Sequence, residues 1–289
     1  MEKIESQQKH KESIKISEKA DYKEVLDGAE KIANIEKIPQ GHFELIDIDK
    51  ETELFYSFMK RGRFSSAFDK MYPGLRVIQE ECKDKDECTK RYRKFLEDLR
   101  ITKEEEMLVA REQIESEWKK IEVVFLKTLS EHFETEWPGD KPNIVGYVSN
   151  LPIFPRFLDN YQFCVGYKKI SDSIETSAHE IVHFLWFKKW KEVFPEIERK
   201  EYEVPHLAWR LSEIMDPIIL QCHPKIKEII KPKRWGYTSF ESIKIGDVGM
   251  VDFFKKIYLD CINSGDNFET ILKKLWDEAK KHEKEISVF

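Results

Sequence analysis

Cysteine is scarce in this sequence, and its spacing matches no metal-binding pattern. No two of the five cysteines in the 289 residues are separated by two residues; they are Cys82, Cys88, Cys164, Cys222 and Cys261. A sparse, odd set without C-x-x-C spacing suggests neither a disulfide scaffold nor a cysteine-type zinc finger. We therefore expect reduced thiols, Cys82 and Cys88 included, and a cytoplasmic protein.

Long apolar runs and a strong charge of one sign are also missing. The longest apolar runs, such as residues 184–187 and 218–220, are far shorter than the roughly 20 residues of a membrane-spanning helix. The N-terminal stretch has no apolar core of a secretory signal. The net charge of −6 creates no general attraction to nucleic acids or anionic membranes. We expect neither as a partner.

The composition is that of a folded, mostly helical protein. Hydrophobic residues make up 40% and charged residues 36%, which allows a sizeable core beneath a solvated surface. Residues 1–38, rich in Lys, Glu, Ser and Ile, are either a solvated helix or a mobile tail. Residues 39–101 carry scattered aromatic residues and are predicted as short helices, of unknown role, with a break at Pro73-Gly74.

A strong amphipathic helix is predicted from residue 102. Thr102 and Glu105 have the T-x-x-E spacing of a capping box. An apolar stripe follows at intervals of three and four residues, formed by Ile114, Trp118, Ile121, Phe125 and Leu129. The pattern stops before the Trp-Pro-Gly sequence at 137–139.

Two short strands are predicted next, at residues 143–149 and 161–167. The second alternates aromatic and β-branched residues with smaller or polar ones, which is typical of a half-buried strand. Helical patterns then return almost to the end of the chain, apart from a loop near residues 231–238. The predicted fold class is α+β and mainly α, with a small sheet before the next helix and a helical C-terminal part.

That next helix carries the motif His-Glu-x-x-His. Residues 171–190 read SDSIETSAHEIVHFLWFKKW, and Asp172 with Glu175 form a variant capping box that predicts a helix from about residue 173. His179 and His183 are four residues apart and therefore share one helix face, from which both imidazoles can bind one zinc ion. Glu180 can act as the general base toward water at the open side of the metal.

The alternative is a chance pair of core histidines. Flanking apolar residues such as Ile181, Phe184 and Trp186 make the helix largely buried, and two unpaired histidines would be costly there. A bound metal removes this cost, so we favour a zinc site.

The motif and its setting resemble the gluzincins, the HExxH zinc metallopeptidases. In these enzymes a backing helix and a small sheet precede the active-site helix, and residues 102–129, 143–167 and 172–190 follow that order. The resemblance covers about residues 102–220 and implies a zincin-like domain, placed here at 102–289. It also implies peptide hydrolysis, a substrate bound along the edge strand and a third ligand, glutamate, on a later helix. The third histidine of metzincins is absent.

Two glutamates compete for the place of third ligand. Glu203 lies at a familiar gluzincin separation but comes just before Pro205. Glu213 lies in a helical pattern that Pro205 could open, and Asp216, one turn later, could orient a histidine. We favour Glu213.

A donor for the developing oxyanion is expected after the motif. The gluzincin pattern leaves four candidates, Tyr202, His206, His223 and Tyr237, of which we favour Tyr237 and His206. The aminopeptidase segment GxMEN is absent. The sequence thus predicts a zinc metallopeptidase with one zinc per chain and a peptide or protein substrate. Its alternative is a zincin-like binding or structural module without activity.

Overall fold

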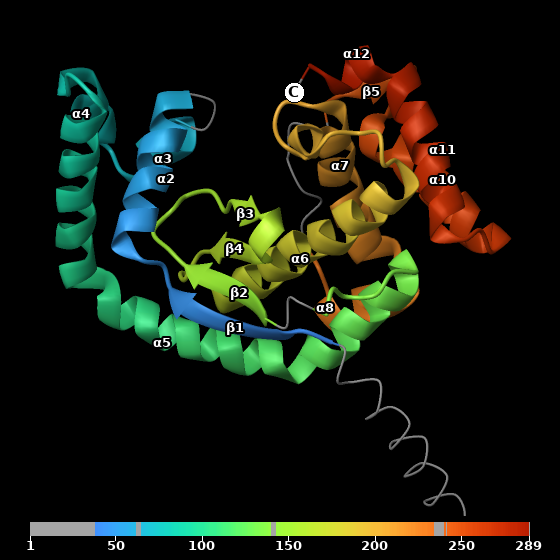
Figure 1. Cartoon of the computed structure of the whole chain (residues 1–289), viewed down its shortest axis with the longest axis horizontal. Coiled ribbons are helices and arrows are strands. Elements are labelled where there is room, and N and C mark those ends of the chain that lie inside the picture. Colours follow the sequence, from blue (N-terminus) through green and yellow to red (C-terminus); the bar gives the residue numbers. More distant parts are fainter. Residues whose placement is uncertain (1–37, 62–64, 140–142, 234–239, 241, 289) are drawn as a thin grey trace, which may run out of the picture. The chain divides into compact units, whose positions relative to one another are not determined.

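The small sheet predicted before the motif is present and has four strands. The computed structural model describes residues 38–61, 65–139, 143–233, 240 and 242–288. Strands β1 (Gln40–Leu45), β2 (Asn143–Val148) and β4 (Gln162–Val165) are parallel, and β3 (Arg156–Phe157) is antiparallel to β4. The order β1-β2-β4-β3 makes β3 an edge strand (Figure 1). The two predicted strands are confirmed as β2 and β4.

Three short helices follow β1, as the aromatic residues between charged stretches predict. They are α2 (Ile48–Arg61), α3 (Ser65–Met71) and α4 (Leu75–Glu81). The predicted break at Pro73-Gly74 is confirmed, and Gly74 has a φ of 102°, a conformation that favours glycine. Phe55 and Phe68 pack edge to face in their shared core, with ring centroids 5.1 Å apart.

A single helix of 49 residues, α5 (Lys85–Phe133), runs beneath the sheet (Figure 1). It begins at Asp84, whose carboxylate accepts a hydrogen bond of 2.9 Å from the Glu87 amide. The prediction that a helix starts at residue 102 is wrong, since the Thr102 hydroxyl donates to the Leu99 carbonyl within the helix, 2.9 Å away. No proline or glycine interrupts residues 85–133, and the buried side chain of Leu96 extends the apolar face backward.

Helix α5 continues through residues 101 and 102, where the sequence predicts a domain boundary. The described residues from Pro39 onward form one compact unit. The separate roles assigned to 39–101 and 102–289 stay predictions. Contact between α5 and β1 is close: Lys119 Nζ donates to the Gly41 carbonyl at 2.8 Å, and Glu122 accepts from the Gly41 amide.

The C-terminal part is helical, as predicted. Helix α6 (Ile170–Val193) is followed by α7 (Leu207–Cys222), which packs against it and against α8 (Pro224–Ile230). Two short 3-10 helices, η1 (Leu158–Asn160) and η2 (Arg199–Tyr202), lie in the connections. A two-stranded hairpin, β5 (Lys244–Ile245) and β6 (Val248–Gly249), precedes α10 (Met250–Ser264), α11 (Phe268–Lys281) and α12 (Glu283–Ile286).

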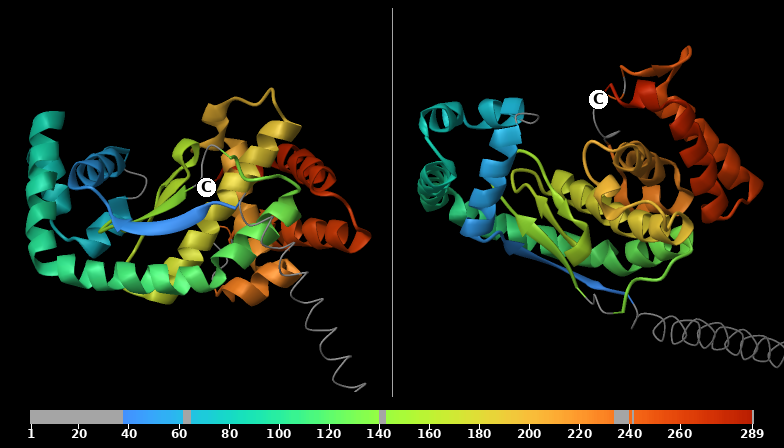
Figure 2. Two further views of the ribbon diagram at one scale, coloured as in Figure 1. Left: turned by 60° about the horizontal axis from the view of Figure 1, so that its bottom comes forward. Right: turned by 45° about the horizontal axis from the view of Figure 1, so that its top comes forward.

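Helices α10 and α11 lie side by side next to α7 (Figure 2). Trp190 of α6 packs against Trp276 of α11 with centroids 4.9 Å apart, so α6 is covered on this side as well. Among the described residues, no helix is long and apolar enough to span a bilayer.

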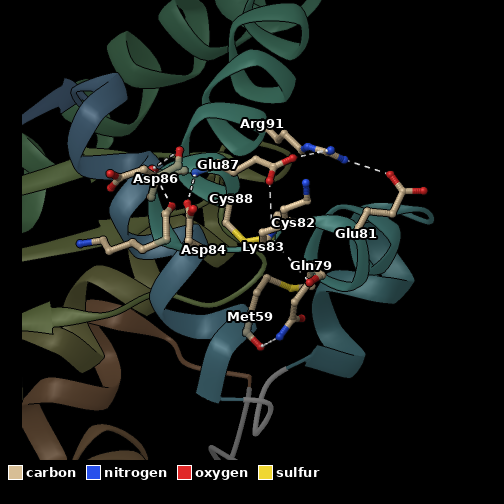
Figure 3. The surroundings of a disulfide bond; sticks show 12 residues. Met59, Gln79, Glu81, Cys82, Lys83, Asp84, Asp86, Glu87, Cys88 and Arg91 are labelled. Carbon is tan, nitrogen blue, oxygen red and sulfur yellow. Dashed lines mark hydrogen bonds and ion pairs between the residues drawn. A yellow bond between two sulfur atoms is a disulfide. The ribbon is translucent and has the colours of Figure 1, made fainter.

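The expectation of reduced thiols is wrong for two cysteines. Cys82 and Cys88 form a disulfide between the end of α4 and the first turn of α5 (Figure 3). The short connection between the helices brings their Cα atoms to 5.3 Å, within the range that a disulfide spans. No spacing motif marks this pair, because the turn between two helices creates the proximity. Cys164, Cys222 and Cys261 are free thiols.

Candidate metal centre

Helix α6 places the HExxH motif in the interior of the protein. It begins at Ile170, so the predicted start near residue 173 and its capping box are wrong. Asp172 pairs with Lys169 at 2.7 Å, and the Glu175 carboxylate accepts from the Lys233 amide at 3.1 Å. The helix is buried on almost all sides because the sheet, α5 and α7 pack around it.

The two histidines point their Nε2 atoms toward each other. His179 and His183 come from consecutive turns, and their Nε2 atoms are 3.3 Å apart. The His183 side chain is fully buried, whereas the His179 side chain is 20% exposed. One side of the pair is therefore open to a ligand and the other is closed by protein.

Helix α7 brings Glu213 to the same point. Its Oε2 lies 3.4 Å from His179 Nε2, and its Oε1 lies 3.5 Å from His183 Nε2. We call these three residues the His–Glu cluster; it is the one group in the described part of the chain with the composition and spacing of a metal site. Ligands about 2.1 Å from a tetrahedral zinc ion are about 3.4 Å from one another. The cluster has this spacing.

The surroundings of the cluster carry more negative than positive charge. Asp216 Oδ2 lies 2.8 Å from His183 Nε2, and Arg156 Nη1 of β3 donates to Glu213 Oε1 at 2.7 Å. Among the residues that the structure describes, Glu180 brings the buried carboxylates to three, and they face one buried guanidinium. Two negative charges are then uncompensated when the histidines are neutral, a costly state for a buried site. A divalent cation would neutralise them.

The pKa values of the buried side chains at the site reflect the same excess of negative charge. Burial raises the pKa of Glu180 to about 7, against the opposing charges of His179 and Arg156. Burial also raises the pKa of the Asp216 carboxyl well above its usual range. For His179, burial alone would lower the pKa, but a hydrogen bond to Glu213 and the nearby carboxylates raise it to about 9. In the absence of a cation, bound protons neutralise part of the excess negative charge.

Several polar atoms of the site have no hydrogen-bond partner among the described residues. They include Glu180 Oε2, His183 Nδ1, and Nε and Nη2 of Arg156. Buried groups in this state cost free energy that a bound ion, water or substrate would recover. The Glu180 side chain, next to His179 along the helix, is one of these unsatisfied buried groups.

Asp216 occupies a different place from the one predicted. We expected it to orient a histidine from behind, through the nitrogen that does not face a metal. Instead its carboxylate approaches His183 Nε2, the atom that also faces His179 and Glu213. Glu213 and Asp216 are three residues apart on α7, so both carboxylates reach the same side of α6.

The rival third ligand, Glu203, lies elsewhere. Its carboxylate pairs with Arg199 at 2.9 Å, and its side chain is 49% exposed. It follows η2, outside α7. Among the described residues, Glu213 rather than Glu203 joins the two histidines.

Of the four candidate oxyanion donors, three lie among the described residues, and none of these three belongs to the His–Glu cluster. His206 is the N-cap of α7, seven residues before Glu213, which corresponds to about 10 Å along a helix axis. Tyr237 lies outside the described residues. The Tyr202 ring stacks on Phe187 at 4.6 Å, and His223 caps α8 by accepting from the Ile226 amide at 3.3 Å. The catalytic roles of His206 and Tyr237 stay predictions.

Sequence analysis missed Arg156. It lies between two prolines and the second strand, in a segment with no catalytic motif, and its partner Glu213 is 57 residues away. The pairing of β3 with β4 brings it to the site. Its position near Pro155 gives no local signal that could identify it.

Comparisons with known proteins identify no family for this chain. Neither a protein-family model, nor a characterised protein, nor a solved structure matches this chain. A function is therefore inferred from the HExxH motif and the geometry around it.

Proposed function

We propose that this chain is a zinc-dependent hydrolase that cleaves peptide bonds, with one zinc ion held by the His–Glu cluster. The observation that carries the proposal is the distance of 3.3–3.5 Å between its ligand atoms. Two histidines and one glutamate are a ligand set of catalytic zinc sites, in which the fourth position is left for water or substrate. A bound zinc ion polarises a carbonyl group. It also lowers the pKa of the water molecule bound to it, so that this water can lose a proton near neutral pH.

Glu180 is the proposed general base. It follows His179 directly, and its buried Oε2 has no hydrogen-bond partner among the described residues. The carboxylate would take a proton from the attacking water and pass it to the leaving amine. Burial raises the pKa of this carboxyl to about 7 in the metal-free chain, and the positive charge of a bound zinc ion would lower it again and so favour the ionised form that acts as a base.

Arg156 is the proposed positioning residue for Glu213. Its Nη1 binds Glu213 Oε1 at 2.7 Å, which directs Oε2 toward His179. Both side chains are less than one-tenth exposed, so this geometry is held firmly. The two remaining donors, Nε and Nη2, have no partner in the described part of the chain. They are available to the negative charge that develops on a carbonyl oxygen.

A peptide suits the site because β3 is an edge strand. An extended chain can add to such an edge through main-chain hydrogen bonds. Arg156 belongs to this strand and also contacts the His–Glu cluster. A peptide bound along β3 would therefore lie within reach of the same arginine that holds Glu213.

Metal content tests the proposal first. Protein purified without added metal should contain about one zinc ion per chain, measured by elemental analysis, or take up one on titration. Zinc-loaded protein is then incubated with a peptide mixture, with Glu180→Gln as the control that keeps the ligands. No zinc at either stage would reject the proposal. One zinc with no cleavage that depends on Glu180 would instead favour a non-catalytic metal-binding module.

A further inference from the structure

A cavity of about 490 Å³ lies where η1 and η2 meet the second half of α6. This volume is typical of ligand-binding clefts. We call it the edge cavity, because it begins where the edge strand β3 ends. Its lining contains five apolar or aromatic side chains, from Leu158, Tyr161, Phe184, Phe187 and Tyr202. All five are buried or half-buried, so they form an apolar floor.

A single aromatic ring separates the edge cavity from the His–Glu cluster. The Phe187 ring lines the cavity and is stacked on the His183 ring, with the centroids 6.1 Å apart and the planes 16° from parallel. The guanidinium carbon of Arg156 lies 5.6 Å from the centre of the same ring. A ligand that contacts Phe187 in the cavity is therefore one ring away from a proposed zinc ligand.

The edge strand leads into this cavity. Strand β3 ends at Phe157, and the next two residues, Leu158 and Asp159, line the cavity. A peptide that adds to the edge of a sheet places its side chains in pockets along that edge. A peptide bound along β3 beside Arg156 would therefore place a side chain in the edge cavity.

The charged residues that line the edge cavity are paired within the described part of the chain, except for one lysine. Arg199 of η2 binds both carboxylate oxygens of Asp159 in η1, each at 3.0 Å. Lys188 pairs with Glu192 at 2.7 Å. Lys191 also lines the cavity and is exposed, and it has no partner among the described residues. The charge left without a partner is therefore a cation, which attracts a carboxylate.

The size of the cavity allows more than one group to bind. A dry cavity of about 150 Å³ holds one benzene ring, and the edge cavity has about three times this volume, 490 Å³. A large apolar side chain on the floor therefore leaves space for a neighbouring residue. That residue would lie toward the exposed side of the cavity, where Lys191 is placed.

We infer that the edge cavity binds two neighbouring groups of the peptide substrate, a large apolar side chain on its floor and a carboxylate at Lys191. The carboxylate belongs either to an acidic side chain or to the end of the substrate chain. The inference rests on the proposed peptidase function and names its substrate class: peptides in which a large apolar residue adjoins a carboxylate, close to the bond that is cut.

Binding is measured without turnover, on the full chain carrying Glu180→Gln, in the presence of chelator. Ligand-observed NMR compares the N-acetylated, amidated dipeptides Phe-Glu, Phe-Gln and Ala-Glu, and the N-acetylated Phe-Gln with a free carboxyl end. Phe-Glu should bind about tenfold or more tightly than Ala-Glu, which has no ring to bury.

The same comparison identifies the source of the carboxylate. At low salt, Phe-Glu or the free-acid Phe-Gln should bind about two- to fivefold more tightly than amidated Phe-Gln, the effect of one exposed ion pair. The tighter of these two probes shows whether a side chain or a chain end is preferred. Equal binding of Phe-Glu and Ala-Glu, or no gain from either carboxylate, would overturn the inference.

Charge reversal at Lys191 locates the carboxylate. The Lys191→Glu variant should bind amidated Phe-Lys more tightly than Phe-Glu, the opposite of the order in the chain that keeps Lys191. Lys256→Glu changes the net charge equally at an 81% exposed position of α10, outside the cavity, and should keep the original order. A lysine near the end of a helix can also act only through the helix dipole. In that case reversal at Lys191 leaves the order unchanged, which would overturn the inference.

A bulky side chain at Asp159 tests whether the probe occupies the cavity. The Asp159 side chain is 74% exposed, so a larger side chain is tolerated there. Asp159→Trp should weaken binding of Phe-Glu by about tenfold or more, because its indole takes the place of the probe's ring. Asp159→Asn also loses the charge that pairs with Arg199 but adds no bulk, and it should not weaken binding. Equal binding by both variants would overturn the inference.

Cleavage separates this inference from the proposed function. Zinc-loaded protein should cut a peptide mixture preferentially close to a large apolar residue that adjoins a carboxylate, as read by mass spectrometry. Lys191→Glu should redirect this preference toward a neighbouring lysine. Glu180-dependent cleavage without either preference would overturn the inference and leave the hydrolase standing. Selective binding of Phe-Glu by a chain that takes up no zinc would support the cavity and reject the peptidase.

Discussion

Replacing Arg156 with methionine tests whether a cation belongs between the buried carboxylates. The change removes the guanidinium that, in the described part of the chain, interacts with Glu180, Glu213 and Asp216, and methionine retains an apolar stem of similar length. Arg156 and Glu213 are 8% and 3% exposed and 2.7 Å apart. Removing one member of such a buried pair costs about 3–5 kcal/mol. At roughly 2–4 °C per kcal/mol for a domain of this size, Tm should fall by roughly 6–20 °C in metal-free protein.

The fall should be clearly smaller with zinc. A bound divalent cation becomes the partner of Glu213, so the carboxylate is no longer left without a counter-charge. The loss of a positive charge beside the ion is expected to outweigh the loss of the hydrogen bond that positions Glu213. Since folding and binding are linked, the smaller fall in Tm with zinc must then also appear as tighter zinc binding by the variant. Calorimetric unfolding of the Arg156→Met variant in chelator and in zinc, together with a zinc titration, measures both quantities.

Arg199→Met is the matched control. Arg199 pairs with two carboxylates, Glu203 and Asp159, but its side chain is 40% exposed. Surface pairs contribute at most about 1 kcal/mol each, so Tm should fall by no more than about 8 °C, and by the same amount in chelator and in zinc. An equal fall for Arg156→Met in chelator and in zinc would refute the argument that a metal shares Glu213 with the arginine.

Three further predictions concern catalysis, ligation and pH. Glu180→Gln should keep one zinc per chain and lose about 10²-fold or more in turnover, because an amide cannot accept the proton; wild-type rates would exclude Glu180 as the base. Glu213→Ala should weaken zinc binding by about tenfold or more and Glu203→Ala should not, as a competition titration with a chelator will show. Burial and the charge of His223 lower the pKa of His132 to about 3. The unfolded chain then binds more protons below pH 6.5, and stability should fall by up to about 1.4 kcal/mol per pH unit between pH 6.5 and 3. Urea unfolding at pH 7 and 5 should show a smaller difference for His132→Gln, and an unchanged difference would contradict the prediction.

Local patterns were enough to predict the kinds of element and the motif. The alternation of residues 161–167 identified a strand, and the spacing of His179 and His183 placed both on one helix face. The hydrophobic period and the residue spacing involve positions only a few residues apart, so both can be recognised in the sequence alone. The same reasoning failed at the start of α5. A capping box also occurs by chance within a longer helix, and no local signal distinguishes the two.

Tertiary structure decided which residues meet. Glu213 and Glu203 are similar candidates in sequence, but the packing of α7 against α6 brings only Glu213 to the histidines. Arg156 reaches Glu213 from a two-residue strand. The backbone amide of Asn150 donates to Glu51, which lies 99 positions away in the sequence. These arrangements depend on the packing of helices and strands that are far apart in the sequence. The free energy of that packing comes from contacts between distant residues, so the spacing of residues along the chain does not reveal it.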